Sequence, residues 1–109
     1  MWLFTTIGFF SVVQKRGESG LTVRARVASD LDRLREKYLP ELSATTPKGG
    51  TDYPFRATIT HPDFARGLAK IGGDIHYDNF KSEVARKMGR KREAVYEKVW
   101  SALFELENE

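Results

Sequence analysis

The chain has 109 residues, enough for one domain with a modest core, and we expect a single domain over residues 1–109. Its 40% hydrophobic and 30% charged residues are ordinary for a soluble globular protein, and the lack of cysteine excludes disulfides and cysteine-based metal sites. The net charge of +3 is unevenly placed, with six basic residues against one acid in residues 81–92 and five acids against one lysine in residues 93–109. A cytoplasmic location is the default expectation.

The first fourteen residues, MWLFTTIGFFSVVQ, predict a strand, because aromatic and β-branched side chains suit a pleated surface. Both faces of this run are largely apolar, so we expect a central strand with Leu3, Ile7 and Phe9 buried and a bend at Gly8. A transmembrane helix needs about 20 apolar residues, more than this run supplies. A signal peptide begins with basic residues, whereas the pair Lys15–Arg16 follows the run. We therefore expect the run to be part of the folded domain, and we expect no membrane among the partners of the chain.

A polar loop, an alternating strand and a helix come next. Residues 14–20 contain two glycines and predict a hairpin loop. Residues 21–27 alternate apolar and polar side chains, which predicts a half-buried strand antiparallel to the first. Ser29 is a suitable N-cap for a helix that Pro40 bounds. The predicted buried stripe of this helix consists of Leu31, Leu34, Tyr38 and Leu42.

A third strand and a second helix are predicted after the linker-like residues 40–52. The strand covers residues 53–60, with Tyr53 facing inward and with Pro54 favouring an edge position. Thr60 caps the helix that follows, and a glycine pair ends it. Its apolar side chains recur at helical spacing as Phe64, Leu68 and Ile71.

Two more helices are predicted towards the C-terminus. Asp78 or Asn79 caps the first, and Gly89 breaks the pattern before the second. The second helix carries an apolar face broad enough to need a large covering surface. This face consists of Val95, Tyr96, Val99, Trp100, Leu103, Phe104 and Leu106.

These elements predict an α+β fold with a small antiparallel sheet. The strand–helix–strand segment from residue 21 to residue 60 is expected to be a right-handed crossover that skips one strand. The third strand then pairs with the first, which gives the order 2-1-3, a split βαβ arrangement related to ferredoxin-like sheets. The first two helices cover one sheet face. The C-terminal helical segment or a second subunit covers the other, and we prefer the monomer.

The chain contains, in order, the stretches MWLFTTIGFFSVV, LTVRARV, DLDRLREKYLP, TDYPFR, YDNFKSEVARKMG and VYEKVW. Together they resemble a family of small uncharacterised bacterial proteins, and the TDY-P-FR and Y-x-NFK-x-EVA blocks are the most specific. The family has no assigned activity, so the resemblance implies a compact bacterial cytosolic domain and supplies no mechanism. Relatives often carry an acidic residue or Thr before the tyrosine, so His76 departs from the family pattern.

The polar sides of the second and third strands carry three arginines, namely Arg24, Arg26 and Arg56. With both strands beside the first, the arginines share a sheet face with Trp2, Phe4 or Phe10. An open face with aromatic and basic groups stacks and tracks single-stranded nucleic acid. In the interpretation that we favour, the arginine stems instead pack on aromatic rings under the C-terminal helix, and their charges pair with its acids.

A second basic group surrounds the Gly89 break. It consists of Lys81, Arg86, Lys87, Arg90, Lys91 and Arg92. Such a cluster can contact phosphates. More often it is a solvated helix surface, and the acidic tail that follows can neutralise it within the chain.

The segment DIHYD brings Asp74, His76 and Asp78 to one face if it is extended, within metal-ligand reach of one another. The plainer interpretation, which we favour, is a solvated connector whose last acid caps a helix. No phosphate-binding glycine loop, nucleophile elbow or catalytic acid pair is present, so nothing indicates an enzyme or a cofactor.

Three functional hypotheses remain. The leading one is a non-enzymatic interaction or regulatory module whose partner is another protein or a second copy of the chain. The alternative is a nucleic-acid-binding domain that uses the three strand arginines or the basic group at residues 81–92. A small-molecule binder or enzyme at Asp74–Asn79 comes third.

Overall fold

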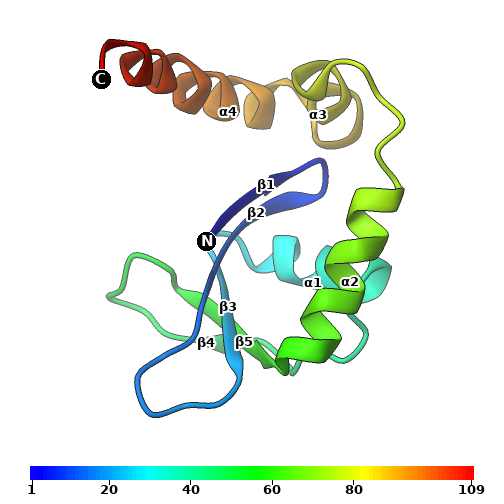
Figure 1. Ribbon diagram of the computed structural model, residues 1–109, viewed down its shortest axis with the longest axis vertical. Coiled ribbons are helices and arrows are strands. Elements are labelled where there is room, and N and C mark those ends of the chain that lie inside the picture. The colour runs from blue at the N-terminus through cyan, green and yellow to red at the C-terminus, as the bar shows by residue number, and fades with distance from the viewer. The chain divides into compact units, whose positions relative to one another are not determined.

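The computed structural model describes residues 1–109, and its contacts divide the chain into two compact units, Met1–Ile75 and His76–Glu109. The first unit holds a sheet and two helices, and the second holds the remaining helices (Figure 1). The expectation of a single domain stays a prediction. None of the helices combines the length and the apolar composition that crossing a membrane requires.

The first unit is built on a five-stranded sheet in which every neighbouring pair is antiparallel. In sheet order the strands are β1 (Trp2–Thr5), β2 (Gly8–Val13), β3 (Leu21–Ala25), β5 (Phe55–Ile59) and β4 (Thr46–Pro47). The α+β class, with an antiparallel sheet and a C-terminal helical segment, is therefore confirmed. The order 2-1-3 and the crossover that skips a strand are wrong, because β5 pairs directly with β3. A ferredoxin-like arrangement is not confirmed.

The first apolar run is a hairpin rather than one central strand. Thr5 lies opposite Gly8 in the register, and the chain reverses between them. The Oγ1 atom of Thr5 accepts the main-chain N–H groups of Ile7 at 3.2 Å and Gly8 at 3.0 Å, which fixes the turn. The run therefore supplies two neighbouring strands and not one. Of these two strands, β1 lies at the edge of the sheet. Ile7 is buried as predicted, whereas Leu3 and Phe9 are only half-buried.

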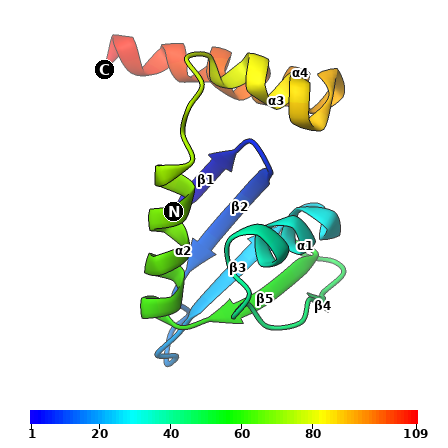
Figure 2. The same ribbon diagram turned by 90° about the vertical axis from the view of Figure 1, so that its right-hand side faces the viewer.

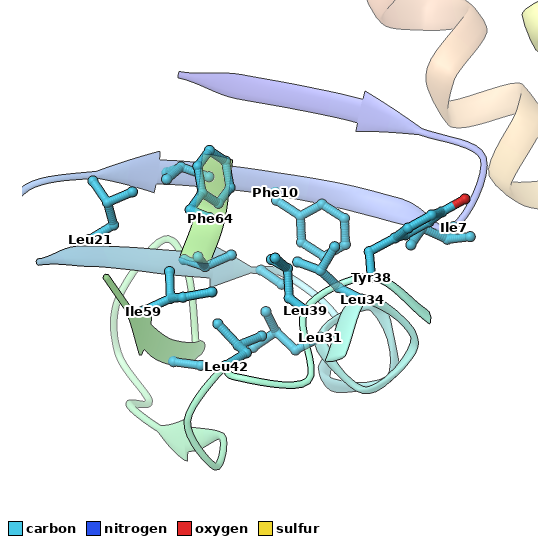
Figure 3. Packing of buried hydrophobic residues seen from close by; sticks show 14 residues of the cluster. Ile7, Phe10, Leu21, Leu31, Leu34, Tyr38, Leu39, Leu42, Ile59 and Phe64 are labelled. Atoms are coloured by element: carbon cyan, nitrogen blue, oxygen red, sulfur yellow. The ribbon is translucent and has the colours of Figure 1, made fainter. Parts of the chain in front are cut away.

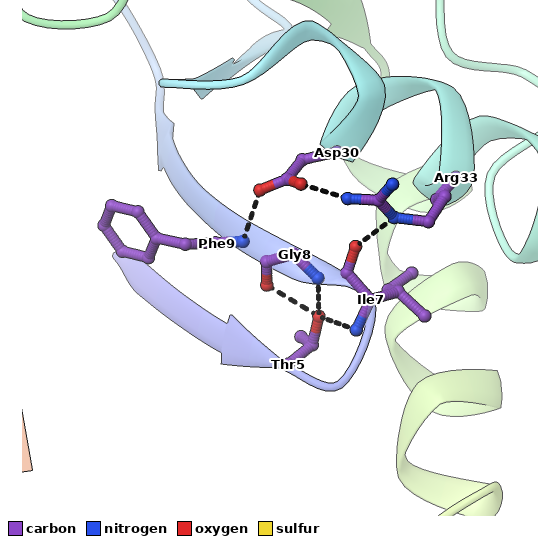
Figure 4. Close-up of polar contacts among 6 residues, drawn as sticks. All are labelled: Thr5, Ile7, Gly8, Phe9, Asp30 and Arg33. Atoms are coloured by element: carbon purple, nitrogen blue, oxygen red, sulfur yellow. Dashed lines mark hydrogen bonds and ion pairs between the residues drawn. The ribbon is translucent and has the colours of Figure 1, made fainter. Parts of the chain in front are cut away.

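Helix α1 (Ala28–Lys37) is joined to this hairpin by polar side chains (Figure 4). The Asp30 carboxylate, in a residue only 2% exposed, accepts the N–H of Phe9 at 3.0 Å. Arg33 forms an ion pair with Asp30, and its Nε donates to the carbonyl of Ile7 at 2.8 Å. The close approach requires a glycine in β2, because a Cβ at Gly8 would lie 2.7 Å from the Cγ of Asp30.

The start of α1 differs from the prediction. Its N-cap is Val27, which makes no side-chain capping bond, and Ser29 lies inside the first turn. Asp30 lies in the first turn of the helix, and its carboxylate binds the hairpin. The helix ends at Lys37, before Pro40, as predicted.

One face of the sheet carries the hydrophobic core, and α1 and α2 (His61–Gly73) both cover it (Figures 2 and 3). The apolar sides of β3 and β5 point into this core, as their alternation predicted. Thr60 caps α2 by accepting the N–H of Asp63 at 3.3 Å, which confirms the predicted cap. The predicted helical side chains also lie in this core or pack against it: Leu31, Leu34, Tyr38, Leu42, Phe64, Leu68 and Ile71.

The second unit consists of α3 (Phe80–Met88), α4 (Arg90–Ala102) and the 3₁₀ helix η1 (Leu103–Asn108). Asn79 caps α3 by accepting the N–H of Ser82 at 2.9 Å, and Gly89 separates α3 from α4 with a φ of 95°. Both features were predicted. The small core of this unit is centred on Tyr96, whose ring stacks on Phe80 at 5.8 Å.

Candidate nucleic-acid interface

The sheet face opposite the core carries a row of side chains across neighbouring strands. The register places Trp2 opposite Ser11, Ser11 opposite Arg24, and Arg24 opposite Arg56. Opposed residues of an antiparallel sheet project from the same face, with their Cβ atoms about 5 Å apart. Their neighbours along the strands belong to the core or pack against it, namely Leu3, Phe10, Val12, Val23, Ala25, Phe55 and Ala57. The row therefore lies on the second face.

Aromatic side chains cover the β1–β2 end of this face. The Phe9 ring stacks on Phe4 at 4.5 Å and meets the edge of Trp2 at 5.9 Å. Trp2 is 66% exposed, so most of its ring is open to a ligand. The sequence interpretation placed Phe10 here, which is wrong. The turn in the first run reverses the parity of β2, so Phe10 lies fully buried in the core and Phe9 takes its place on the second face.

Tyr53 connects the aromatic end of the face with the arginines. Its ring centroid lies 6.4 Å from that of Phe9, 4.6 Å from the Arg24 guanidinium carbon and 4.9 Å from that of Arg26. Tyr53 was predicted to face the core with the apolar side of its strand. It is buried, but it lies on the arginine side and outside the core cluster, because it precedes the first paired residue of β5.

We call this surface the arginine face. It comprises Trp2, Phe4, Phe9, Ser11, Arg24, Arg26, Tyr53 and Arg56. Two of the arginines are held in place by hydrogen bonds. The Nη2 atom of Arg24 donates to Oγ of Ser11 at 2.6 Å, and Nε of Arg56 donates to the carbonyl of Tyr53 at 3.3 Å. The Nε atom of Arg24 is buried without a hydrogen-bond partner.

The arginine face has a strongly positive electrostatic environment. Arg24, Arg26 and Arg56 form no ion pair with an acidic side chain of the first unit, and the expected pairing with C-terminal acids stays a prediction. The charge of Arg56 is the largest cause that lowers the pKa of the nearby Lys15 below its ordinary value. Burial, Lys48 and Arg24 lower the same pKa further, against an opposing effect of Glu18. Lys15 and Lys48 thus add positive charge beside Arg24 and Arg56 of the arginine face.

The basic group around Gly89 is engaged largely within the second unit. Arg86 donates two hydrogen bonds to Glu83, at 3.1 Å from Nε and 2.5 Å from Nη2, and Lys87 lies 3.9 Å from the same carboxylate. The hydrogen bond from Arg86 is the main cause that lowers the pKa of Glu83, and burial opposes it. The Lys81 ammonium lies 4.2 Å above the Trp100 ring. Arg92 lies over Tyr96, which leaves Arg90 and Lys91 as the remaining cations of the group.

For Asp74, His76 and Asp78 the sequence left a metal site open but favoured a solvated connector. The chain contains no group of three His, Asp or Glu side chains close enough to hold a metal ion. The Oδ2 atom of Asp74 accepts the hydroxyl of Tyr38 at 2.7 Å, and His76 packs against the edge of Tyr77. Asn79 rather than Asp78 caps α3.

Sequence reasoning found the three arginines of the arginine face but missed Phe9, Tyr53, Lys15 and Lys48. Phe9 was missed because the chain reverses between Thr5 and Gly8, which moves Phe9 to the arginine side, and no turn signal in the sequence marks this reversal. The Lys15 and Lys48 side chains come from loops, whose positions no alternation pattern predicts.

No protein-family model, no curated protein sequence and no solved structure matches this chain. The resemblance to a family of small bacterial proteins therefore stays a prediction.

Proposed function

We propose that the first unit is a non-enzymatic binding module whose arginine face takes single-stranded nucleic acid. The observation that carries the proposal is the row in which the exposed Trp2 and the opposed Arg24 and Arg56 share one sheet face. Aromatic rings stack bases of any sequence, and guanidinium groups bind the phosphates between them. This proposal takes up the nucleic-acid alternative in place of the leading hypothesis of a module that binds a protein or a second copy of the chain.

The dimensions of the face suit a short segment of single strand. The row from Trp2 to Arg56 crosses three inter-strand spacings, roughly 14 Å at about 4.8 Å each. A sheet surface of this width stacks two or three bases in known RNA-binding domains. Bases would stack at the Trp2 end, and phosphates would lie over Arg26, Arg56 and Lys15.

The arginine face is favoured over the basic group at residues 81–92 because the two surfaces differ in internal pairing. Arg86 and Lys87 already bind the Glu83 carboxylate, and a phosphate would have to compete with it. The arginines of the sheet have no such competitor. A cytoplasmic location, where single-stranded RNA is abundant, belongs to this proposal.

Fluorescence anisotropy with a labelled single-stranded twelve-mer tests the proposal. We expect binding at low salt, with an affinity that falls steeply as salt rises. Arg56→Gln should flatten the slope of log K against log salt by about 0.7, the value for one phosphate contact on a single strand. Trp2→Ala should weaken binding by about 1–3 kcal/mol at every salt concentration, as loss of one stacked base does.

Lys70→Gln is the matched control. Lys70 is exposed on α2, which covers the opposite sheet face, so removal of its charge should leave affinity and slope nearly unchanged. Equal losses in Arg56→Gln and Lys70→Gln would indicate nonspecific attraction to net charge. Absence of binding at low salt, or dependence on Arg90 and Lys91 instead of Arg56, would refute the arginine face as the site.

A further inference from the structure

The second unit leaves much of its apolar surface uncovered. Five of the nine exposed large hydrophobic residues of the chain lie on α4 and η1. Their exposed fractions are 51% for Val95, 49% for Trp100, 53% for Leu103, 52% for Phe104 and 57% for Leu106. A contiguous apolar surface of this kind marks an interaction site more often than a solvated helix.

Three of the uncovered residues, Val95, Leu103 and Leu106, form a stripe at helical spacing together with the half-buried Val99. Val95, Val99, Leu103 and Leu106 follow one another at intervals of three and four residues, which places them on one side of the helical segment. We call these four residues the α4 stripe. Tyr96, which stacks on Phe80, precedes Val99 by three residues, so the side of α4 that meets α3 borders the stripe along Val99. The other three stripe residues, Val95, Leu103 and Leu106, are exposed.

The charges at the two ends of the α4–η1 segment indicate which partner packs on the stripe. Residues 90–92 at the start of α4 are Arg-Lys-Arg, whereas η1 and the terminal residue carry Glu105, Glu107 and Glu109. A second copy of the same segment, packed antiparallel, sets each acidic end beside the basic start of its partner. A parallel pair would set like charges together, and like charges across an interface suppress association.

We propose that the α4 stripe docks onto the same stripe of a second copy of this chain, in an antiparallel, two-fold symmetric pair. In such an isologous pair each contact occurs twice, so both ends contribute the same charge attraction. The segment is roughly 30 Å long, from 1.5 Å per α-helical residue and about 2 Å per 3₁₀ residue. This length lets four apolar side chains per copy interdigitate. The inference does not depend on nucleic-acid binding.

Sedimentation equilibrium of the full chain measures the association. We expect a mass of twice 12.4 kDa for the wild type at high concentration, dissociating on dilution. Leu103→Asp places a charge in the centre of the stripe and should give a monomer of 12.4 kDa. Ser101→Asp is the matched control, since it adds the same charge on the opposite side of the helix and should remain a dimer. Circular dichroism verifies that both variants keep the wild-type helix content.

Charge reversal tests the antiparallel direction. Replacing Arg90 and Lys91 with Glu should raise the dimer dissociation constant about tenfold, because acid then meets acid. Replacing Glu105 and Glu107 with Lys in the same chain should restore it. A monomeric wild type at about 1 mM, a dimer that tolerates Leu103→Asp, or a double reversal that stays dissociated would each overturn the proposal.

Discussion

The Asp30 carboxylate accepts the main-chain N–H of Phe9 at 3.0 Å and so ties α1 to a hairpin twenty-one residues earlier in the chain. Asp30 also pairs with Arg33, which binds the carbonyl of Ile7 at the hairpin turn. We expect Asp30→Ala to lower the free energy of unfolding by about 2–4 kcal/mol. The substitution leaves a main-chain donor without its partner and a part-buried guanidinium without its counter-ion. Urea denaturation measures the loss.

The control for this prediction is Asp32→Ala on the same helix. The Asp32 side chain is 69% exposed, and its ion pair with Arg35 spans one helical turn at the surface. Such exposed pairs contribute less than about 1 kcal/mol, so the variant should unfold near the wild-type midpoint. If both variants lose the same stability, the contact between Asp30 and the hairpin is not what stabilises the first unit.

The Asp30 contact also explains why the sequence predicted the strand order wrongly. The run from Met1 to Gln14 has no Asn-Gly or Asp-Gly pair, the sequence signal typical of a two-residue hairpin. Its turn depends on the hydroxyl of Thr5 and on groups from α1, and a contact between distant residues leaves no trace in local periodicity. The later elements were predicted well, because the caps at Thr60 and Asn79 and the alternation of β3 are local signals.

The candidate site was predictable to the same extent. Arg24 and Arg56 alternate with apolar residues in their strands, so their side of the sheet followed from the sequence. The sequence did not predict that Arg24 and Arg56 lie directly opposite one another, because this position requires β3 and β5 to pair. The position of Tyr53 depends on the loop before β5, which carries no periodic pattern.

Gly67 supplies a test of how α2 packs on the first unit. A Cβ added to Gly67 would lie 1.9 Å from Cδ2 of Leu39 and 3.1 Å from the carbonyl oxygen of Tyr38. Leu39 is fully buried and the carbonyl belongs to the main chain, so neither can move without cost. We expect Gly67→Ala to destabilise by about 1–3 kcal/mol, the usual cost of overpacking.

The same substitution at Gly72 serves as the comparison. Nothing lies within 4 Å of a Cβ at Gly72, which is in the last turn of α2. Gly72→Ala should be neutral or stabilise by up to about 1 kcal/mol, because alanine lowers the entropy of the unfolded chain. Thermal melting followed by circular dichroism separates the two variants, and a more stable Gly67→Ala would contradict the close packing of α2 on Leu39.

Glu83 should make the second unit sensitive to acid. Its pKa lies below the ordinary value of 4.5, chiefly because Arg86 donates to its carboxylate. The unfolded chain therefore binds more protons than the folded one between the lowered pKa and 4.5, and stability falls as the pH falls through this window. Above the window the contribution is fully present. Trp100 fluorescence in a Trp2→Phe background reports unfolding of this unit at each pH.

Glu83→Gln should lower stability at neutral pH and remove this part of the acid sensitivity, since the amide does not titrate in this range. Glu97→Gln, at an exposed position of α4, should keep the wild-type pH profile. Identical profiles for the wild type and Glu83→Gln would show that the ion pair with Arg86 does not stabilise the folded unit.

The pKa of Lys15 reports the positive charge of the arginine face without a measurement of nucleic-acid affinity. Its pKa lies below the ordinary value of 10.5, and the positive charge of Arg56 is the largest cause. Arg56→Gln removes that charge, so the pKa of Lys15 should move towards 10.5. A bound phosphate chain should raise it further, because an anion favours the protonated ammonium. Carbon NMR of lysine side chains follows the titration, with Lys70→Gln as the control that leaves it unchanged. A Lys15 pKa that is insensitive to both Arg56→Gln and a single-stranded oligonucleotide would contradict the positive cluster and the proposed position of the phosphates.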